Sequence, residues 1–98
     1  MKKNISVLGS TGSIGLNVLS LINKKKLIFK VNVLAANKNY KLICEQIVKF
    51  KPKVFIISNY KVFLKVKKKY KKKNIEILNN LESIKNNFKK SDITIAAI

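Results

Sequence analysis

The sequence predicts an α/β protein built on a doubly wound parallel β-sheet with helices on both faces. Three observations support this fold class. Short apolar runs alternate with stretches whose apolar residues recur at helical spacing, in the order βαβαβαβαβ. The runs are apolar almost throughout, which is typical of strands buried on both faces. All three glycines of the chain fall between the first run and the first helical stretch, where a parallel sheet of this kind turns tightly from strand to helix.

The first strand is predicted at residues 4–8, and the first helix begins after the glycines. Residues 4–8 form a β-branched run that ends at Gly9. The helix is predicted from apolar residues at offsets of four, seven and eight, namely Ile14, Val18, Leu21 and Ile22. Asn23 and the lysines at 24–26 end this helix, because cations are favoured at a helix C-terminus.

The remaining strands and helices alternate to the end of the chain. Strands are predicted at Phe29–Ala36, Val54–Ile57, 75–78 and 93–98. A second helix has an apolar face formed by Tyr40, Ile43, Cys44, Ile47 and Phe50, and Pro52 stops it. A more polar helix is predicted at 59–70, and a short one with Leu81, Ile84 and Phe88 on one face. A complete doubly wound domain continues past its last strand, so we expect a sheet truncated after residues 93–98.

The composition limits the class of protein. With 98 residues, 47% of them apolar, the chain is large enough for one small domain. No apolar stretch approaches the ~20 residues of a membrane span. The start of the chain lacks the apolar region and the cleavage site of a secretory signal. We therefore expect a cytoplasmic protein with no membrane partner.

The net charge of +18 raises the hypothesis of nucleic-acid binding. Its strongest support is the run bounded by Lys65 and Lys73, in which seven of nine residues are lysine. Arg, which makes the bidentate contacts favoured in phosphate and base recognition, is absent. Lys, Asn and Ile make up 48 of the 98 residues, a bias that an A- and T-rich coding sequence produces without selection for a ligand. We expect no nucleic-acid partner and interpret the run as a solvated helix face.

The glycines have the spacing G-x-x-G-x-x-G, which in this position predicts a Rossmann-like nucleotide-binding loop. Gly9 permits the tight turn out of the strand, Gly12 lets the backbone approach a pyrophosphate, and Gly15 lets the helix pack close to the sheet. The N–H groups of Gly12, Ser13 and Ile14 at the helix N-terminus then face phosphate oxygens. Thr11 and Ser13 add hydroxyl donors. An ordinary turn capped by Ser13 is the alternative interpretation of the loop.

The end of the second strand predicts which dinucleotide binds. An NAD-preferring site carries an Asp or Glu ~20 residues beyond the loop, where the carboxylate binds the ribose 2′-OH. Residues 34–39 contain no acid. Lys38 offers a cation there, and Asn37 and Asn39 offer amide donors, which suit a 2′-phosphate. The sequence therefore favours NADPH as the cofactor.

No catalytic residue and no metal ligand is predicted within the chain. His is absent, and the one cysteine, Cys44, excludes an internal disulfide. The acids are spread over the sequence without a convergent spacing, and we interpret them as surface or strand-start residues: Glu45, Glu76, Glu82 and Asp92. Cys44 falls on an apolar helix face, where a structural thiol is expected.

These residues resemble the N-terminal NADPH-binding segment of 1-deoxy-D-xylulose 5-phosphate reductoisomerase. The resemblance runs the whole length of the chain and rests on five segments: Gly9-Ser10-Thr11-Gly12-Ser13-Ile14-Gly15, Ala36-Asn37-Lys38-Asn39, Glu45-Gln46, Phe50 with Pro52, and Ala96-Ala97-Ile98. It implies NADPH contacts at the residues already singled out: Thr11, Gly12, Ser13, Ile14, Asn37, Lys38 and Asn39. The family usually has Gly where Asn37 stands. Asn best tolerates a left-handed backbone among the other residues, so we expect the turn to be kept.

The resemblance also implies what the whole enzyme does. In the family, NADPH reduces an aldehyde formed by rearrangement of the sugar phosphate, giving 2-C-methyl-D-erythritol 4-phosphate for non-mevalonate isoprenoid synthesis. A divalent cation, Mg²⁺ or Mn²⁺, is held by one Asp and two Glu. Family members are several times longer and are expected to be homodimers. The resemblance therefore implies that residues 1–98 are a partial NADPH-binding domain, without the catalytic and C-terminal domains, and that this chain alone is inactive.

Two other hypotheses stay open at the level of sequence. One is a segment of another NADP-dependent dehydrogenase with a similar loop, such as a semialdehyde dehydrogenase, which carries a nucleophilic Cys. The other is a basic non-catalytic module that binds nucleic acid or a partner through the run bounded by Lys65 and Lys73. Against the second, the aromatic residues Phe29, Phe50, Phe55 and Phe88 are expected in the core, away from the lysines.

Overall fold

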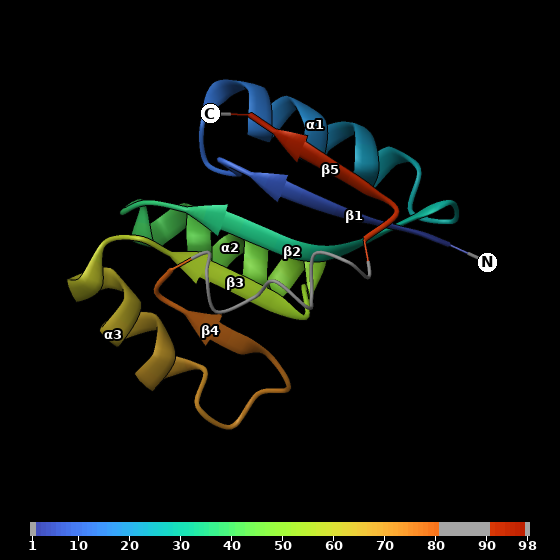
Figure 1. The fold of residues 1–98 in the computed structure, drawn as a ribbon. Coiled ribbons are helices and arrows are strands. Elements are labelled where there is room, and N and C mark those ends of the chain that lie inside the picture. Colours follow the sequence, from blue (N-terminus) through green and yellow to red (C-terminus); the bar gives the residue numbers. More distant parts are fainter. Residues whose placement is uncertain (1, 81–90, 98) are drawn as a thin grey trace.

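The computed structural model describes residues 2–80 and 91–97 as one parallel sheet with helices (Figure 1). Its strands are β1 Lys3–Leu8, β2 Phe29–Ala36, β3 Val54–Ile57, β4 Glu76–Leu78 and β5 Ile93–Ala96. The helices are α1 Ser13–Lys24, α2 Tyr40–Phe50 and α3 Tyr60–Lys69. The parallel α/β fold predicted from the sequence is confirmed. The short helix predicted around Leu81, Ile84 and Phe88 lies outside the described residues.

The strand order is β4-β3-β2-β1-β5, and it indicates the edge of the sheet at which a ligand is expected to bind. From β1 the chain moves outward through β2, β3 and β4, and β5 then pairs with the opposite side of β1. The direction of winding therefore reverses at β1, as it does in a doubly wound sheet. Ligands of such sheets bind beyond the carboxyl ends of the strands at this switch point. In Figure 1 all five arrowheads point to the same edge, so the loops after β1 and β2 begin side by side.

The main core lies between the sheet and the three described helices. It includes Leu19 and Ile22 from α1, Ile43 and Ile47 from α2 and Val66 from α3, packed on strand residues such as Val7 and Phe55. The opposite face of the sheet carries a smaller cluster of Val33, Ala35, Val54 and Ile56. All three described helices thus lie on one face, and the prediction of helices on both faces depends on residues outside the described part. Within that part, no helix has the length and apolarity to cross a membrane.

The buried face of α1 agrees only in part with the one predicted, because Ile22 is buried and Val18 packs against the core but the face is rotated away from Ile14 and Leu21. Gly15, Leu19 and Ile22 are buried, whereas Ile14 and Leu21 are 62% and 60% exposed. The close approach of the helix start to the strand turn explains the difference, because a Cβ on Gly15 would lie 2.8 Å from Ser10 Cα. Only glycine fits against the turn, so Gly15 must face inward and the helix is rotated to that side. A pattern of apolar residues gives glycine no weight, so it is right for Val18 and Ile22 but wrongly includes Ile14 and Leu21 in the buried face.

Candidate functional site

The loop between β1 and α1 is a tight turn built on the end of β2. Gly9 has φ 87°, the left-handed conformation that favours glycine. The N–H groups of Gly9 and Ser10 both donate to the Ala35 carbonyl oxygen, at 2.8 and 2.9 Å. The Gly12 N–H donates back to the Gly9 carbonyl at 3.3 Å. The predicted roles of Gly9 in the turn and of Gly15 in close packing are confirmed.

Gly12 differs from the other two glycines because its α-carbon faces open space. It is exposed, and its φ of −81° and ψ of 173° are extended backbone that any residue adopts. A Cβ here would have its nearest contact 3.7 Å away, at the Gly9 carbonyl oxygen. The fold therefore leaves room beside Gly12 for another group to approach the backbone.

The start of α1 carries unused N–H donors. Gly12 is the N-cap, and no side chain caps the helix, so the interpretation of the loop as a turn capped by Ser13 is wrong. The first intrahelical bond runs from the Leu16 N–H to the Gly12 carbonyl at 2.9 Å, which leaves the N–H groups of Ser13 and Ile14 without an acceptor inside the helix. Both residues are exposed, Thr11 beside them is half-buried, and the first turn contains no acid. This arrangement suits an anion.

The turn after β2 forms the second half of the candidate site. Asn37, Lys38 and Asn39 are exposed at the carboxyl end of β2, next to the turn after β1. The Asn39 side chain caps α2, because its Oδ1 accepts from the Leu42 N–H at 3.2 Å. Asn37 does not adopt a left-handed backbone: among the described residues other than glycine, Lys51 alone has a positive φ. The turn therefore forms without the left-handed backbone that we expected Asn37 to tolerate.

Hydrogen bonds to the start of the segment after β3 hold Asn37. The Asn59 N–H donates to the Asn37 carbonyl at 3.1 Å, and the Ser58 N–H donates to the Ala36 carbonyl at 3.1 Å. The Ser58 hydroxyl donates to Asn37 Oδ1 at 2.9 Å. Ser58 had no role in the sequence-based site, because a contact between residues 21 positions apart leaves no local pattern.

A second contact that the sequence pattern did not reveal holds the glycine loop against α2. Gln46 on α2 is 4% exposed, and its Nε2 donates to the Ser10 carbonyl at 2.9 Å. Neither Gln46 Oε1 nor Ser10 Oγ, both buried, has a hydrogen-bond partner within the described part of the chain. The only indication of this residue in the sequence was the Glu45-Gln46 pair, one of the segments on which the family resemblance rests. Gln46 therefore ties the glycine loop to the helix beside it.

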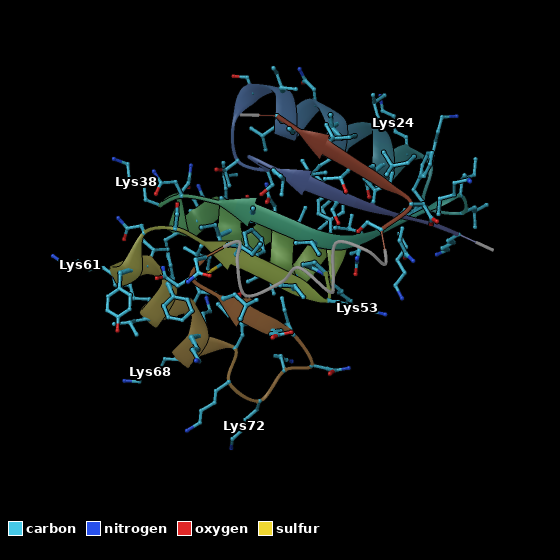
Figure 2. All side chains as sticks on the ribbon, in the orientation of Figure 1. Lys24, Lys38, Lys53, Lys61, Lys68 and Lys72 are labelled. Carbon is cyan, nitrogen blue, oxygen red and sulfur yellow. The ribbon has the colours of Figure 1, made fainter. Side chains whose placement is uncertain are left out.

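The lysines that Figure 2 labels do not lie on one face of the described residues. The labelled lysines in Figure 2 extend on different sides, with Lys38 and Lys61 at the carboxyl edge of the sheet and Lys24 and Lys53 at the opposite one. Within the lysine run, the ammonium groups of Lys65 and Lys69 each lie 5.7 Å from the centre of the Tyr40 ring. Of the aromatic residues expected in the core, Phe55 is buried and Phe29 and Phe50 pack against the core, whereas Phe88 lies outside the described residues. The three of these phenylalanines that the structure describes therefore lie in or against the core, as expected.

The described residues hold no cluster that could bind a metal ion, counting groups of three or more His, Cys, Asp or Glu.

Cys44 is partly buried against the core. Burial, together with a hydrogen bond that the Tyr70 hydroxyl makes to Cys44, raises the pKa of Tyr70 to about 12. A cavity of about 470 Å³ between Ile47, Pro52 and Tyr70 lies among lysines away from the two loops and contains none of the candidate residues. The candidate site is therefore an exposed edge rather than an enclosed cavity.

Comparison with known proteins agrees with this geometry. The family model described as 1-deoxy-D-xylulose 5-phosphate reductoisomerase matches residues 5–98. The chain is 36% identical to the reductoisomerase of Pelagibacter ubique and 42% identical to that of Buchnera aphidicola from Schizaphis graminum, in each case over 98% of the chain. It covers 26% and 25% of these proteins, so it spans about a quarter of the length of the curated relatives it matches.

Solved structures give the same result for the fold. The Zymomonas mobilis reductoisomerase in complex with NADPH superposes with a TM-score of 0.87 at 26% identity, over 100% of this chain and 26% of that one. A reductoisomerase in complex with NADPH, fosmidomycin and magnesium has a TM-score of 0.84 at 20% identity, over 98% of this chain and 24% of that one, and supports the fold alone. From the match over residues 5–98, the chain belongs to the 1-deoxy-D-xylulose 5-phosphate reductoisomerase family.

Proposed function

We propose that residues 1–98 are the NADPH-binding domain of an enzyme that rearranges and reduces 1-deoxy-D-xylulose 5-phosphate to 2-C-methyl-D-erythritol 4-phosphate. The observation that carries this proposal is the open backbone at Gly12, next to the free N–H groups that begin α1. A glycine with space beside it at an uncapped helix N-terminus suits a pyrophosphate. A solved relative with this fold is a complex with NADPH.

The two loops divide the cofactor between them. The N–H groups of Ser13 and Ile14, with the hydroxyls of Thr11 and Ser13, bind the pyrophosphate where it approaches the backbone at Gly12. The Gly12 N–H itself is bonded to the Gly9 carbonyl oxygen. Lys38, with the amides of Asn37 and Asn39, binds the 2′-phosphate, because Lys38 supplies a positive charge and no acid lies in the turn. The Asn39 amide keeps its Nδ2 for this purpose, since only its Oδ1 is used to cap α2. When bound, NADPH supplies the hydride for the reduction.

Substrate and metal are proposed to bind to residues outside this chain. The described acids do not converge on a metal site, and the chain covers about a quarter of its curated relatives. We propose that the sugar phosphate and a divalent cation, Mg²⁺ or Mn²⁺, bind to the rest of the enzyme, which is a cytoplasmic homodimer. A solved relative of the same fold is a complex with magnesium.

The proposal is tested by titrating NADPH and NADH separately into the 98-residue chain and following nucleotide fluorescence. We expect saturable binding of both, with NADPH tighter, because Lys38 has a phosphate to contact only in NADPH. Absence of NADPH binding would overturn the proposed function. Equal affinities would remove Lys38 from its proposed role but keep the pyrophosphate site.

The proposed division of labour has a separate test. The 98-residue chain, given NADPH, the sugar phosphate and Mg²⁺ or Mn²⁺, is expected to show no substrate-dependent oxidation of NADPH, since no described residue is placed for acid–base or metal chemistry. A control reaction with a full-length family member shows that the assay detects turnover. Turnover by the pure 98-residue chain would contradict the proposal.

A further inference from the structure

Asn37 and Ser58 form a side-chain contact at the point where β2 and β3 end. The last register pair of these strands is Ala36 with Ile57, so Asn37 and Ser58 are the next residues on each strand. The Ser58 hydroxyl lies 2.9 Å from Asn37 Oδ1 and 3.4 Å from the Ala36 carbonyl. A hydroxyl has one proton, and the shorter distance assigns it to Asn37 Oδ1. A reversed amide would have to donate to Ser58 Oγ and would leave the hydroxyl proton only the long contact to the Ala36 carbonyl, so the contact favours the orientation with Oδ1 toward Ser58.

The held orientation determines what Asn37 offers to a ligand. A primary amide has a carbonyl oxygen on one side and an NH₂ group on the other. Because Ser58 takes the oxygen, the two N–H donors of Nδ2 face away from β3. Both residues are exposed, and Asn37 directly precedes Lys38. The turn therefore presents amide donors and a cation together, with the amide oxygen turned to the Ser58 side.

We propose that Ser58 is a positioning residue that strengthens the preference of this site for a dinucleotide carrying a 2′-phosphate, in addition to the charge of Lys38. The inference rests on the proposed function and deepens it. A phosphate accepts hydrogen bonds, so the held orientation of Asn37 favours it. A rotated amide directs its oxygen at the phosphate and repels it. Ser58 acts through Asn37 and does not touch the cofactor.

The backbone geometry separates this role from a purely structural one. The strand ends are also joined by the Ser58 N–H to the Ala36 carbonyl and by the Asn59 N–H to the Asn37 carbonyl. These two bonds do not depend on the Ser58 side chain. Removal of the hydroxyl is therefore expected to leave the turn folded and to free only the Asn37 amide.

A double-mutant cycle tests the inference in the full 98-residue chain. The variants are Ser58→Ala, Asn37→Gly, which carries the residue usual in the family, and the two together. NADPH and NADH are titrated into each, and thermal unfolding is followed by circular dichroism. Ser58→Ala is expected to weaken NADPH binding roughly 5- to 10-fold and NADH binding less than about 2-fold. In the Asn37→Gly background the same change is expected to have no effect on either nucleotide.

The matched control is Ser58→Thr, which keeps the hydroxyl and is expected to retain the preference of the parent chain. An equal loss of NADPH and NADH affinity in Ser58→Ala, or a loss that persists with Asn37→Gly, overturns the inference while the proposed function stands. A parent chain that binds neither nucleotide overturns both. A loss confined to NADPH and abolished by Asn37→Gly supports the inference, because a general effect on folding does not depend on the ligand's 2′-phosphate.

Discussion

Alanine at Gly12 and alanine at Gly15 are the same chemical change three residues apart, with opposite expected effects. At Gly12, the new Cβ meets its nearest neighbour at 3.7 Å, an ordinary contact, and φ is −81°. The unfolded chain loses conformational freedom, which favours folding by about 0.5 kcal/mol. Alanine is a poorer N-cap than glycine by a similar amount, so stability should change little. NADPH binding should weaken by at least ~10-fold, because the methyl group occupies the space beside the backbone that the pyrophosphate needs.

At Gly15 the same methyl group has no space. It would lie 2.8 Å from Ser10 Cα and closer still to the Gly9 carbonyl oxygen, against an ordinary carbon–carbon distance of ~3.5–4.0 Å. The turn cannot yield easily, because the Gly9 and Ser10 N–H groups are bonded to the Ala35 carbonyl and Gln46 is bonded to the Ser10 carbonyl. We assign the clash ~3 kcal/mol, and the better helix propensity of alanine returns ~1 kcal/mol.

The net loss of ~2 kcal/mol at Gly15 corresponds to a fall in Tm of ~8–16 °C for a chain of this size. Circular dichroism melts of both variants and of the parent chain measure it, and NADPH titration at a temperature where all three are folded completes the comparison. If Gly12→Ala binds NADPH like the parent, the phosphate does not approach this backbone. If Gly15→Ala melts like the parent, the packing argument is wrong.

Three further outcomes are expected. Lys38→Ala should weaken NADPH binding ~10- to 100-fold and leave NADH binding nearly unchanged, as measured by titration. Replacing Lys67, Lys68 and Lys69 by Gln should not change NADPH affinity, and a loss as large as that of Lys38→Ala would support the basic-module hypothesis. Because the folded pKa of Tyr70 is about 12 against 10.0 for a free tyrosine, the unfolded chain releases this proton first. Stability should therefore be unaffected below pH ~9 and fall by up to ~3 kcal/mol as pH rises from 10 through 12. Denaturant titrations should show that the Tyr70→Phe variant lacks this part of the loss of folding stability at alkaline pH.

The buried strands were predictable because their chemistry is local. β2 and β3 begin and end at the residues predicted, Phe29–Ala36 and Val54–Ile57. Strands buried on both faces must be apolar at nearly every position, and such runs stand out in a chain rich in lysine and asparagine. The glycine loop was equally predictable from the sequence, because the tight turn and the close packing of its backbone require glycine at fixed positions.

The contacts that shape the site were not predictable from the pattern. Gln46 reaches Ser10 across 36 positions, and Ser58 reaches Asn37 across 21. Each is a polar residue whose partner is set by the strand order, which the periodicity of the sequence does not contain. The wrong assignment of Ile14 and Leu21 to the buried face of α1 has a related cause. The residue that fixes the rotation of the helix, Gly15, is absent from any count of apolar side chains.

The carbonyl oxygen of Gly9 lies close to the other two glycines, and its contacts show at which positions the fold requires glycine. The left-handed Gly9 places this oxygen where it accepts from the Gly12 N–H and lies against the position of a Gly15 Cβ. The fold therefore requires glycine at 9 for the turn and at 15 for the packing that the turn imposes. It makes no such demand at 12, where the backbone is extended and a Cβ would have room. The proposed approach of a pyrophosphate accounts for a glycine at a position where the fold does not require one, and the uncapped start of α1 beside it favours an anion.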